Sequence, residues 1–340
     1  MGEPAWRRSA VEAPLAPDIP IIDAHHHLWD EGMSADRFGR FEPEDFVAEI
    51  DRGGHRIVAS VFLQCHWSYR KTGPEVLHCV GETERVEAVA SQFAARGGAH
   101  GDLVAAIVSG ADLTLGDAVD EVLEAHLAAS PTRFRGIRDG IAADPDQPFG
   151  GDRGRGKSSD PRFRAGLARL QRYDLTFDVW CVHPQLDELA ELARAFPDTT
   201  MILNHLATPI GVGRFAGKQA EVFAAWRAGI ERLALCPNVV IKLGGLGMGF
   251  TGYGWGEAPT PPDSETVAAA YSPYVLHAVD AFSPARCMFE SNFPVDGEGY
   301  GYGVLWNAFK RVAARFSADE QRQLFHDTAA RVYRIGPFTV

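Results

Sequence analysis

The sequence lacks the features that would place it among membrane or nucleic-acid-binding proteins. No apolar run approaches the roughly 20 residues that a helix needs to cross a bilayer. Acidic residues outnumber basic ones, 45 to 33, and the resulting net charge of −12 argues against the basic face that binding to phosphates requires. Residues 1–19 contain no apolar core like that of a signal peptide, so we expect a flexible leader and a cytoplasmic protein.

Cysteine is also scarce. The five cysteines are scattered, odd in number and without a Cys-x-x-Cys spacing. This pattern excludes a disulfide framework and a zinc site built from thiolates, and it predicts reduced, mostly buried thiols.

What the sequence does contain is an alternation of short apolar runs with amphipathic stretches. The runs predict strands at 21–29, 56–64, 103–109, 134–139, 175–182, 200–203, 239–243 and 286–291. The amphipathic stretches predict helices at 43–51, 74–96, 117–129, 161–173, 187–196, 218–235, 265–282, 302–316 and 318–333.

This order predicts an α/β fold, a closed (β/α)8 TIM barrel that occupies residues 20–340 as a single domain. An open doubly wound sheet is the alternative, but no Gly-x-Gly-x-x-Gly follows the first strand. Two long Gly-rich loops, 140–161 and 244–264, are expected to cover the carboxyl-terminal rim of the barrel.

Polar side chains follow several of the predicted strands, at the rim where barrel enzymes place their reactive groups. On the first strand, strict alternation puts Asp23, His25 and His27 on one face. The further candidates at strand ends are Gln64, His66, Trp67, Arg138, His183, His205, Lys242, Glu290, Asn292 and Asp296. Imidazole is both a common metal ligand and a proton carrier near neutral pH, so the sequence predicts a catalytic or metal-binding rim.

Three of these motifs resemble the amidohydrolase superfamily, in its "amidohydrolase 2" branch of sugar lactonases, pyrone-dicarboxylate lactonase and metal-dependent aromatic decarboxylases. They are Asp-Ala-His-His-His-Leu-Trp at 23–29, Asn-His-Leu-Ala-Thr-Pro at 204–209 and Phe-Glu-Ser-Asn-Phe-Pro-Val at 289–295. The resemblance extends over nearly the whole chain, from Pro20 to Tyr333. It is specific at the first, sixth and eighth strands and loose between them.

The resemblance implies roles for the histidines. His25 and His27 would bind a divalent metal such as zinc or, as in metal-independent lactonases, contact the substrate carbonyl. His205 would help to polarise that carbonyl, and His183 would be a further metal ligand in a metal-dependent enzyme. Whether a metal is bound is left open at this point.

The chain departs from the family pattern after the eighth strand. Where the family usually reads Gly-Ser-Asp-Trp-Pro, this chain has Asn292 in place of the carboxylate that activates water. An amide can orient a group but cannot accept a proton near neutral pH. Glu290 and Asp296 are the available replacements, and we favour Asp296 because a carboxylate deep in a barrel would need a buried partner.

These roles predict a hydrolase that attacks a small carboxylated lactone, or a related ester-like carbonyl, with an activated water molecule. Arg138 and Lys242 would hold the substrate carboxylate, and Asn292, His66 and Trp67 would line its site.

Two alternatives remain. One is decarboxylation of an aromatic acid by a metal on His25, His27 and His183. The other is a barrel that binds a ligand without turnover. A small molecule is the expected partner, and a homo-oligomer is left open.

Overall fold

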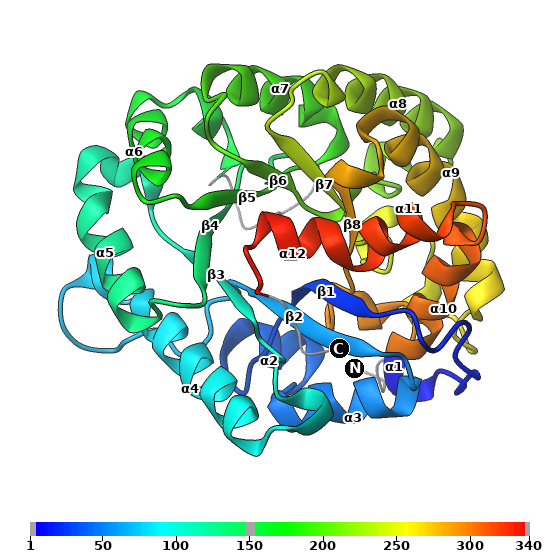
Figure 1. Cartoon of the computed structure of the whole chain (residues 1–340). Coiled ribbons are helices and arrows are strands. Elements are labelled where there is room, and N and C mark those ends of the chain that lie inside the picture. Colours follow the sequence, from blue (N-terminus) through cyan, green and yellow to red (C-terminus); the bar gives the residue numbers. More distant parts are fainter. Residues whose placement is uncertain (1–4, 147–153, 337–340) are drawn as a thin grey trace.

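Eight parallel strands form a ring at the centre of the computed structural model, which describes residues 5–146 and 154–336 (Figure 1). Each strand pairs with its neighbour in sequence, in the order β1 to β8. The strands are β1 (Ile21–His26), β2 (Ile57–Leu63), β3 (Ala106–Gly110), β4 (Phe134–Gly140), β5 (Thr176–Trp180), β6 (Met201–Leu203), β7 (Val239–Leu243) and β8 (Cys287–Phe289).

The ring closes between β1 and the segment that follows β8. The N–H of Asn292 donates to the carbonyl of His25 (2.8 Å), and the N–H of His27 donates to the carbonyl of Phe293 (2.8 Å). The predicted (β/α)8 barrel is therefore confirmed.

Helices surround the ring (Figure 1). They are α1 (Ala5–Arg8), α2 (Gly32–Phe38), α3 (Pro43–Gly53), α4 (Val80–Arg96), α5 (Asp120–Ala129), α6 (Pro161–Arg172), α7 (Leu186–Ala195), α8 (Gln219–Ala234), α9 (Ser264–Phe282), α10 (Tyr302–Ala313), α11 (Ala318–Arg322) and α12 (Thr328–Val332). The helix predicted to begin at residue 74 begins at Val80, after a short 3-10 turn at Glu75–Leu77. Among the described residues, no helix combines the length and apolar character that crossing a bilayer would need.

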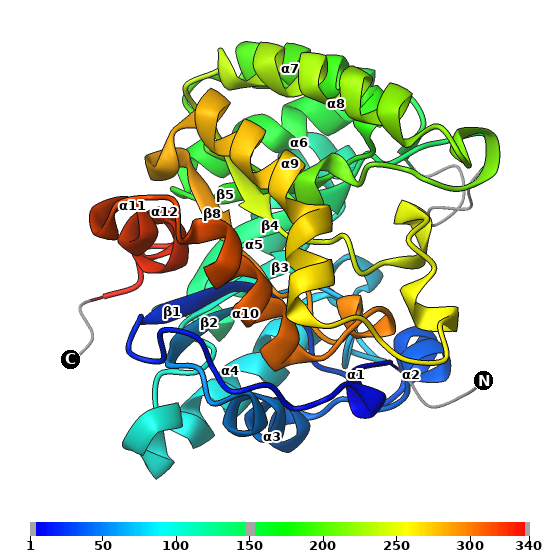
Figure 2. The same ribbon diagram turned by 90° about the vertical axis from the view of Figure 1, so that its right-hand side faces the viewer.

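The C-terminal helix α12 closes the amino-terminal end of the barrel. It crosses the ring of strands in Figure 1, and Figure 2 shows it on the side opposite the loop after β7. Val332 and Tyr333 pack against inward-facing side chains of the strands, among them Ile22, Val240 and Met288. The barrel interior is thus apolar at this end, which leaves the other end for polar chemistry.

The first strand does not alternate strictly, so the prediction that Asp23 shares a face with His25 and His27 is wrong. The pairing of β1 with β2 shifts register between Asp23 and His26. Asp23 points outward and accepts hydrogen bonds from the Ser291 N–H (2.9 Å) and the Tyr302 hydroxyl (3.0 Å). A bulge of this kind re-aims the side chains beyond it, and here it turns His25 and His27 into the barrel.

The second predicted loop, 244–264, is confirmed as irregular, with short 3-10 turns at Gly249–Thr251 and Trp255–Glu257. It lies at the carboxyl-terminal rim (Figure 2). Of the first predicted loop, residues 147–153 lie outside the described residues.

The segment predicted to be a flexible leader contacts the barrel domain at several points after residue 4, where the description begins. The guanidinium of Arg52 donates to the carbonyls of Trp6 (3.1 Å) and Ser9 (2.7 Å). The N–H of Leu15 donates to Oδ1 of Asn307 (2.7 Å). These contacts join the segment to α3 and α10.

Candidate active site

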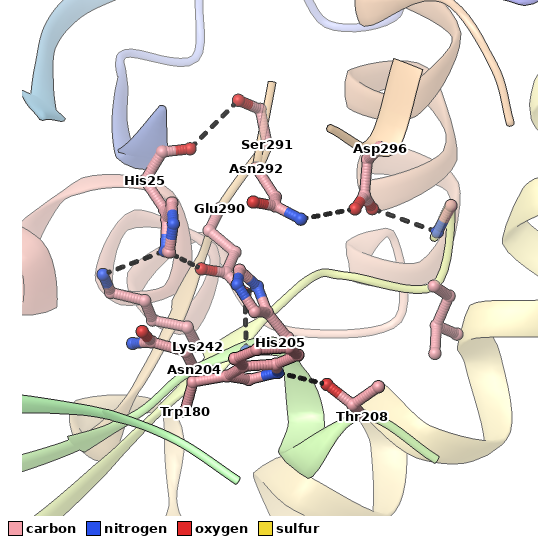
Figure 3. Close-up of polar contacts among 12 residues, drawn as sticks. His25, Trp180, Asn204, His205, Thr208, Lys242, Glu290, Ser291, Asn292 and Asp296 are labelled. Atoms are coloured by element: carbon pink, nitrogen blue, oxygen red, sulfur yellow. Dashed lines mark hydrogen bonds and ion pairs between the residues drawn. The ribbon is translucent and has the colours of Figure 1, made fainter. Parts of the chain in front are cut away.

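Side chains from three distant parts of the chain meet inside the barrel at its carboxyl-terminal rim (Figure 3). His25 lies on β1, His205 follows β6 and Glu290 follows β8. The ring centroids of His25 and His205 are 4.5 Å apart, and the three residues are at most 2% exposed. The expected convergence of strand ends is therefore present.

The carboxylate of Glu290 bridges the two imidazoles. Its Oε2 lies 2.8 Å from Nδ1 of His25, and its Oε1 lies 2.8 Å from both Nδ1 and the backbone nitrogen of His205. Burial raises the pKa of Glu290 to about 8, although the nearby cations Lys242 and Arg138 oppose that rise. In its ionised form Glu290 accepts a hydrogen bond from the Nδ1–H of His205, which leaves Nε2 of that ring with a lone pair.

Two glycines after β7 make room for this arrangement. A Cβ on Gly244 would lie 2.3 Å from Cγ of Glu290, and one on Gly245 would lie 2.4 Å from Cβ of His205. His205 itself has φ of 57°, and the residues after it through Thr208 also have positive φ. Such backbone strain costs free energy at each non-glycine residue and is concentrated at functional sites.

The β1 histidines face each other through their Nε2 atoms. The Nδ1–H of His27 donates to the carbonyl of Leu63 (2.8 Å), so its Nε2 carries a lone pair. That Nε2 lies 3.1 Å from Nε2 of His25. Two lone pairs do not face each other this closely without a proton or a metal ion between them. Two nitrogens on one tetrahedral zinc lie ~3.3 Å apart for Zn–N bonds of ~2.0 Å, so the pair fits a divalent metal.

A second combination of ligand atoms overlaps this pair. Within the described ranges, His25, His205 and Glu290 form a group in which one ligand atom of each lies within 4.8 Å of the others. Burial, followed by the charge of Lys242, lowers the pKa of His25 well below its usual value. A neutral imidazole is the form that binds a metal.

Asp296, the other candidate for the base, belongs to a different cluster. Its Oδ1 accepts a hydrogen bond from Nδ2 of Asn292 (2.7 Å), and its Oδ2 accepts from the hydroxyl of Tyr300 (2.7 Å) and the N–H of Gly247 (3.1 Å). The hydroxyl of Tyr271 lies 3.4 Å from the same Oδ2. Figure 3 shows Asn292 between Glu290 and Asp296, with its amide nitrogen turned to Asp296.

Lys242 was expected to bind the substrate carboxylate at the rim, but it lies deeper inside the barrel. It is fully buried, and its Nζ forms an ion pair with Oδ1 of Asp178 (2.8 Å). The same Nζ lies 3.4 Å from Nδ1 of His25. Its nearest charged partner is therefore a side chain of the barrel itself.

Arg138 is partly buried at the end of β4, and its Nη1 donates to the carbonyl of Gln64 (2.7 Å). Its positive charge lowers the pKa of His27 and of His205, in both cases after the larger effect of burial. A guanidinium this close to the histidines can bind an anion at the same site.

The two predicted lining residues after β2 have different settings. Trp67 is buried; its Nε1–H donates to Asp30 (2.7 Å) and its backbone N–H to Glu82 (2.8 Å). His66 is exposed, and its ring lies 5.3 Å from that of Tyr69. Trp67 thus fixes the loop, while His66 faces solvent.

His183 lies outside the group of ligand atoms described above, within the part of the chain that the structure covers. Its Nδ1 accepts the N–H of Ile210 (3.2 Å), and its ring contacts Phe215 at 4.8 Å between centroids. Burial lowers its pKa to about 4. Its role as a metal ligand stays a prediction.

Sequence reasoning missed two groups next to the site, Asp178 and Tyr333. The hydroxyl of Tyr333 donates to Oδ1 of Asp178 (2.8 Å). A charged residue in the middle of the apolar strand β5 was the available signal for Asp178, because a carboxylate buried there needs a partner. Nothing in the sequence pattern indicates that Tyr333 reaches the same point from the other end of the chain.

The chain is similar to several known proteins. A family model described as amidohydrolase matches residues 22–335. An uncharacterized protein of Sinorhizobium fredii, y4mH, is 35% identical, with 94% of this chain and 99% of that protein covered. An L-fucono-1,5-lactonase of Burkholderia ambifaria is 29% identical, with coverage of 92% and 95%. A crystal structure of an amidohydrolase from Burkholderia multivorans with bound zinc has a TM-score of 0.71 and 25% identity, with coverage of 93% and 99%.

Proposed function

The chain belongs to the amidohydrolase family and is an enzyme, and we propose that it hydrolyses a small carboxylated lactone with an activated water molecule. The observation that carries the proposal is the carboxylate of Glu290, 2.8 Å from both His25 and His205. The similarity to an L-fucono-1,5-lactonase over most of the chain supports lactone hydrolysis.

His205 is the proposed general base. Its Nδ1–H donates to Glu290, so its Nε2 is free to accept a proton from water. The imidazolium formed in this step is stabilised by the adjacent carboxylate, as in other His–carboxylate pairs. Glu290 therefore takes over the functional place of the family carboxylate that Asn292 lacks, by acting through a histidine.

His25 and His27 would hold a divalent metal through their Nε2 atoms, 3.1 Å apart. Such an ion polarises a carbonyl and lowers the pKa of bound water. The other ring nitrogens have fixed partners, Glu290 for His25 and the Leu63 carbonyl for His27. These partners set the tautomer and orientation of each ring, as outer-shell groups of metal sites do.

Arg138 is proposed to hold the carboxylate of the substrate. Its guanidinium lies close enough to His27 and His205 to lower the pKa of each, and a guanidinium binds a carboxylate with two parallel hydrogen bonds. A substrate with an acidic group would thereby place its ester-like carbonyl near the histidines.

The test is a panel of lactones assayed by acid release in a pH-indicator buffer, with L-fucono-1,5-lactone and carboxylated lactones included. We expect turnover by the wild-type protein and loss of turnover in His205→Ala with the fold retained by circular dichroism. Unchanged activity of this variant would remove His205 from the site. Release of CO2 from aromatic acids without lactone hydrolysis would contradict the proposal, and so would ligand binding without turnover.

The metal is tested separately. We expect a divalent ion in the purified protein, and we expect the substitutions His25→Ala and His27→Ala each to lower its content. Full activity in chelator with no bound ion would show that the histidine pair works with a shared proton instead.

A further inference from the structure

A buried polar cluster lies directly beneath the active site, on the side of the closed end of the barrel. It consists of Asp178 from β5, Asn204 after β6, Lys242 from β7 and Tyr333 after α12, and we call it the floor cluster. All four residues are fully buried. The chemistry proposed above uses none of these groups directly.

One oxygen atom organises the floor cluster. Oδ1 of Asp178 accepts the hydroxyl of Tyr333 (2.8 Å) and Nδ2 of Asn204 (3.1 Å), and it forms the ion pair with Nζ of Lys242 (2.8 Å). Oδ2 of Asp178 has no hydrogen-bond partner among the described residues. The orientation of the carboxylate is therefore fixed by the donors on Oδ1.

The floor cluster contacts the active site through Lys242. Its Nζ lies 3.4 Å from Nδ1 of His25, the same ring atom that contacts Glu290. A lysine side chain is long and flexible, and here its ion pair with Asp178 and its packing hold the ammonium in place. Its Nζ also lies 5.3 Å from the centroid of the Tyr333 ring, within the range of a cation–π contact.

Tyr333 is itself held firmly. Its side chain packs in the barrel interior, and its carbonyl accepts a hydrogen bond from Nε of Arg135 (2.8 Å). Burial and the charge of Asp178 raise the pKa of Tyr333 well above its usual value, so the hydroxyl remains a donor. The segment after α12 thus reaches the floor cluster from the closed end of the barrel.

We propose that Tyr333 is a positioning residue of the active site, which holds Asp178, and through it Lys242, in the orientation that sets His25. The inference rests on the proposed function in that the rate it affects is that of lactone hydrolysis. The hydroxyl acts only through other residues and does not touch the substrate.

The test is Tyr333→Phe, which keeps the ring and removes the hydroxyl. We expect kcat for the lactone to fall about tenfold, the effect of losing one hydrogen bond to a charged acceptor, with KM changed by less than about twofold. In a crystal structure of the variant, we expect Asp178 to turn and the distance between Nζ of Lys242 and Nδ1 of His25 to lengthen from 3.4 Å.

The matched control is Tyr302→Phe. Tyr302 is also fully buried and donates to a buried carboxylate, Oδ2 of Asp23 (3.0 Å), but on the outer face of β1. We expect a similar decrease in melting temperature for both variants, with kcat preserved only in Tyr302→Phe. An equal fall in kcat in both would overturn the inference, because general stability would then explain the effect.

The inference would also be overturned if Asp178 and Lys242 kept their positions in the crystal structure of Tyr333→Phe. Failure of the proposed function gives a different result, because the wild-type protein would then hydrolyse none of the lactones. The crystallographic comparison of the two variants would still decide whether Tyr333 positions the floor cluster.

Discussion

Glu290 and Asp296 lie six residues apart after the same strand, and both are fully buried carboxyl groups. Burial raises the pKa of Glu290 to about 8 and that of Asp296 to about 7. Their partners differ. Glu290 faces the imidazoles of His25 and His205, whereas Asp296 accepts hydrogen bonds from Asn292, Tyr300 and the backbone of Gly247.

This difference shows why a perturbed pKa alone does not identify a catalytic group. Tyrosine and amide donors do not exchange protons readily near neutral pH, so the Asp296 cluster is suited to holding loops together. It joins the segment after β8 to the loop after β7 and, through Tyr271, to α9. Imidazoles do exchange protons in this range, so we propose the Glu290 cluster as the catalytic one.

The largest expected effect separates the two carboxyl groups directly. Glu290→Gln keeps the size of the side chain but removes the charge that stabilises an imidazolium at His205. We expect kcat/KM for lactone hydrolysis to fall about 10³-fold, within the usual range for loss of acid–base catalysis. Asp296→Asn is the matched control, and we expect its kcat/KM to stay within about tenfold of the wild-type value. The opposite order of effects would assign the catalytic role to Asp296.

The next largest effect concerns the position where the family has its carboxylate. Asn292→Asp would place a second carboxylate 2.7 Å from Asp296, and the described residues place no cation between the two. We expect the free energy of unfolding to decrease by about 3 kcal/mol. In the double variant Asn292→Asp with Asp296→Asn, an amide at residue 296 again faces a carboxylate at residue 292. We expect this variant to recover most of the lost free energy of unfolding. Urea unfolding of the two single variants and the double variant measures the coupling; additive losses would contradict it.

A smaller effect is expected for Asp296→Asn alone. The oxygen of the new amide can still accept hydrogen bonds from Tyr300 and Gly247. Its nitrogen, however, faces the amide nitrogen of Asn292, and these two donors repel each other unless the Asn292 side chain rotates. We expect a decrease of about 1 kcal/mol in the free energy of unfolding, measured at neutral pH by urea titration. If Asp296→Asn lowered the free energy of unfolding more than Asn292→Asp does, the charge at residue 296 would matter more than the hydrogen bond between residues 292 and 296.

The last prediction concerns the pH dependence of that difference. The pKa of Asp296 is raised from 3.8 to about 7 in the folded protein, so the folded state binds the proton more tightly than the unfolded state. The resulting stabilisation is fully present below pH 3.8 and is lost as the pH rises through about 7. The advantage of the wild-type protein over Asp296→Asn should therefore shrink from pH 4 to pH 8 in matched unfolding titrations. An advantage that grows with pH would contradict the raised pKa.

Local pattern predicted much of the framework. The strand at 239–243 is observed with the same bounds, because a run of β-branched residues between turn signals leaves little choice. The eighth strand was predicted to extend to residue 291 but ends at Phe289. Beyond that point, the N–H of Ser291 donates to Asp23, a contact 268 residues away that no local pattern contains.

The sequence predicted which residues belong to the candidate site, but it did not predict which of them contact one another. Counting strand ends placed His25, His205 and Glu290 at one rim, since all parallel strands of a barrel end there. The choice between Glu290 and Asp296 depended on which partners surround each carboxyl group. Sequence reasoning favoured Asp296 because it assumed no buried partner for Glu290, and the structure provides two.

The sequence by itself determined the barrel, the rim at which its reactive groups gather and the absence of a carboxylate at residue 292, because periodicity and residue type are local properties. Only the tertiary structure decided how those groups pair. The bulge in β1, the room left by Gly244 and the reach of Tyr333 through the floor are set by packing between segments far apart in the chain. The protonation and orientation of a buried group depend on such neighbours, and that is why the contacts of these groups appear only in the folded molecule.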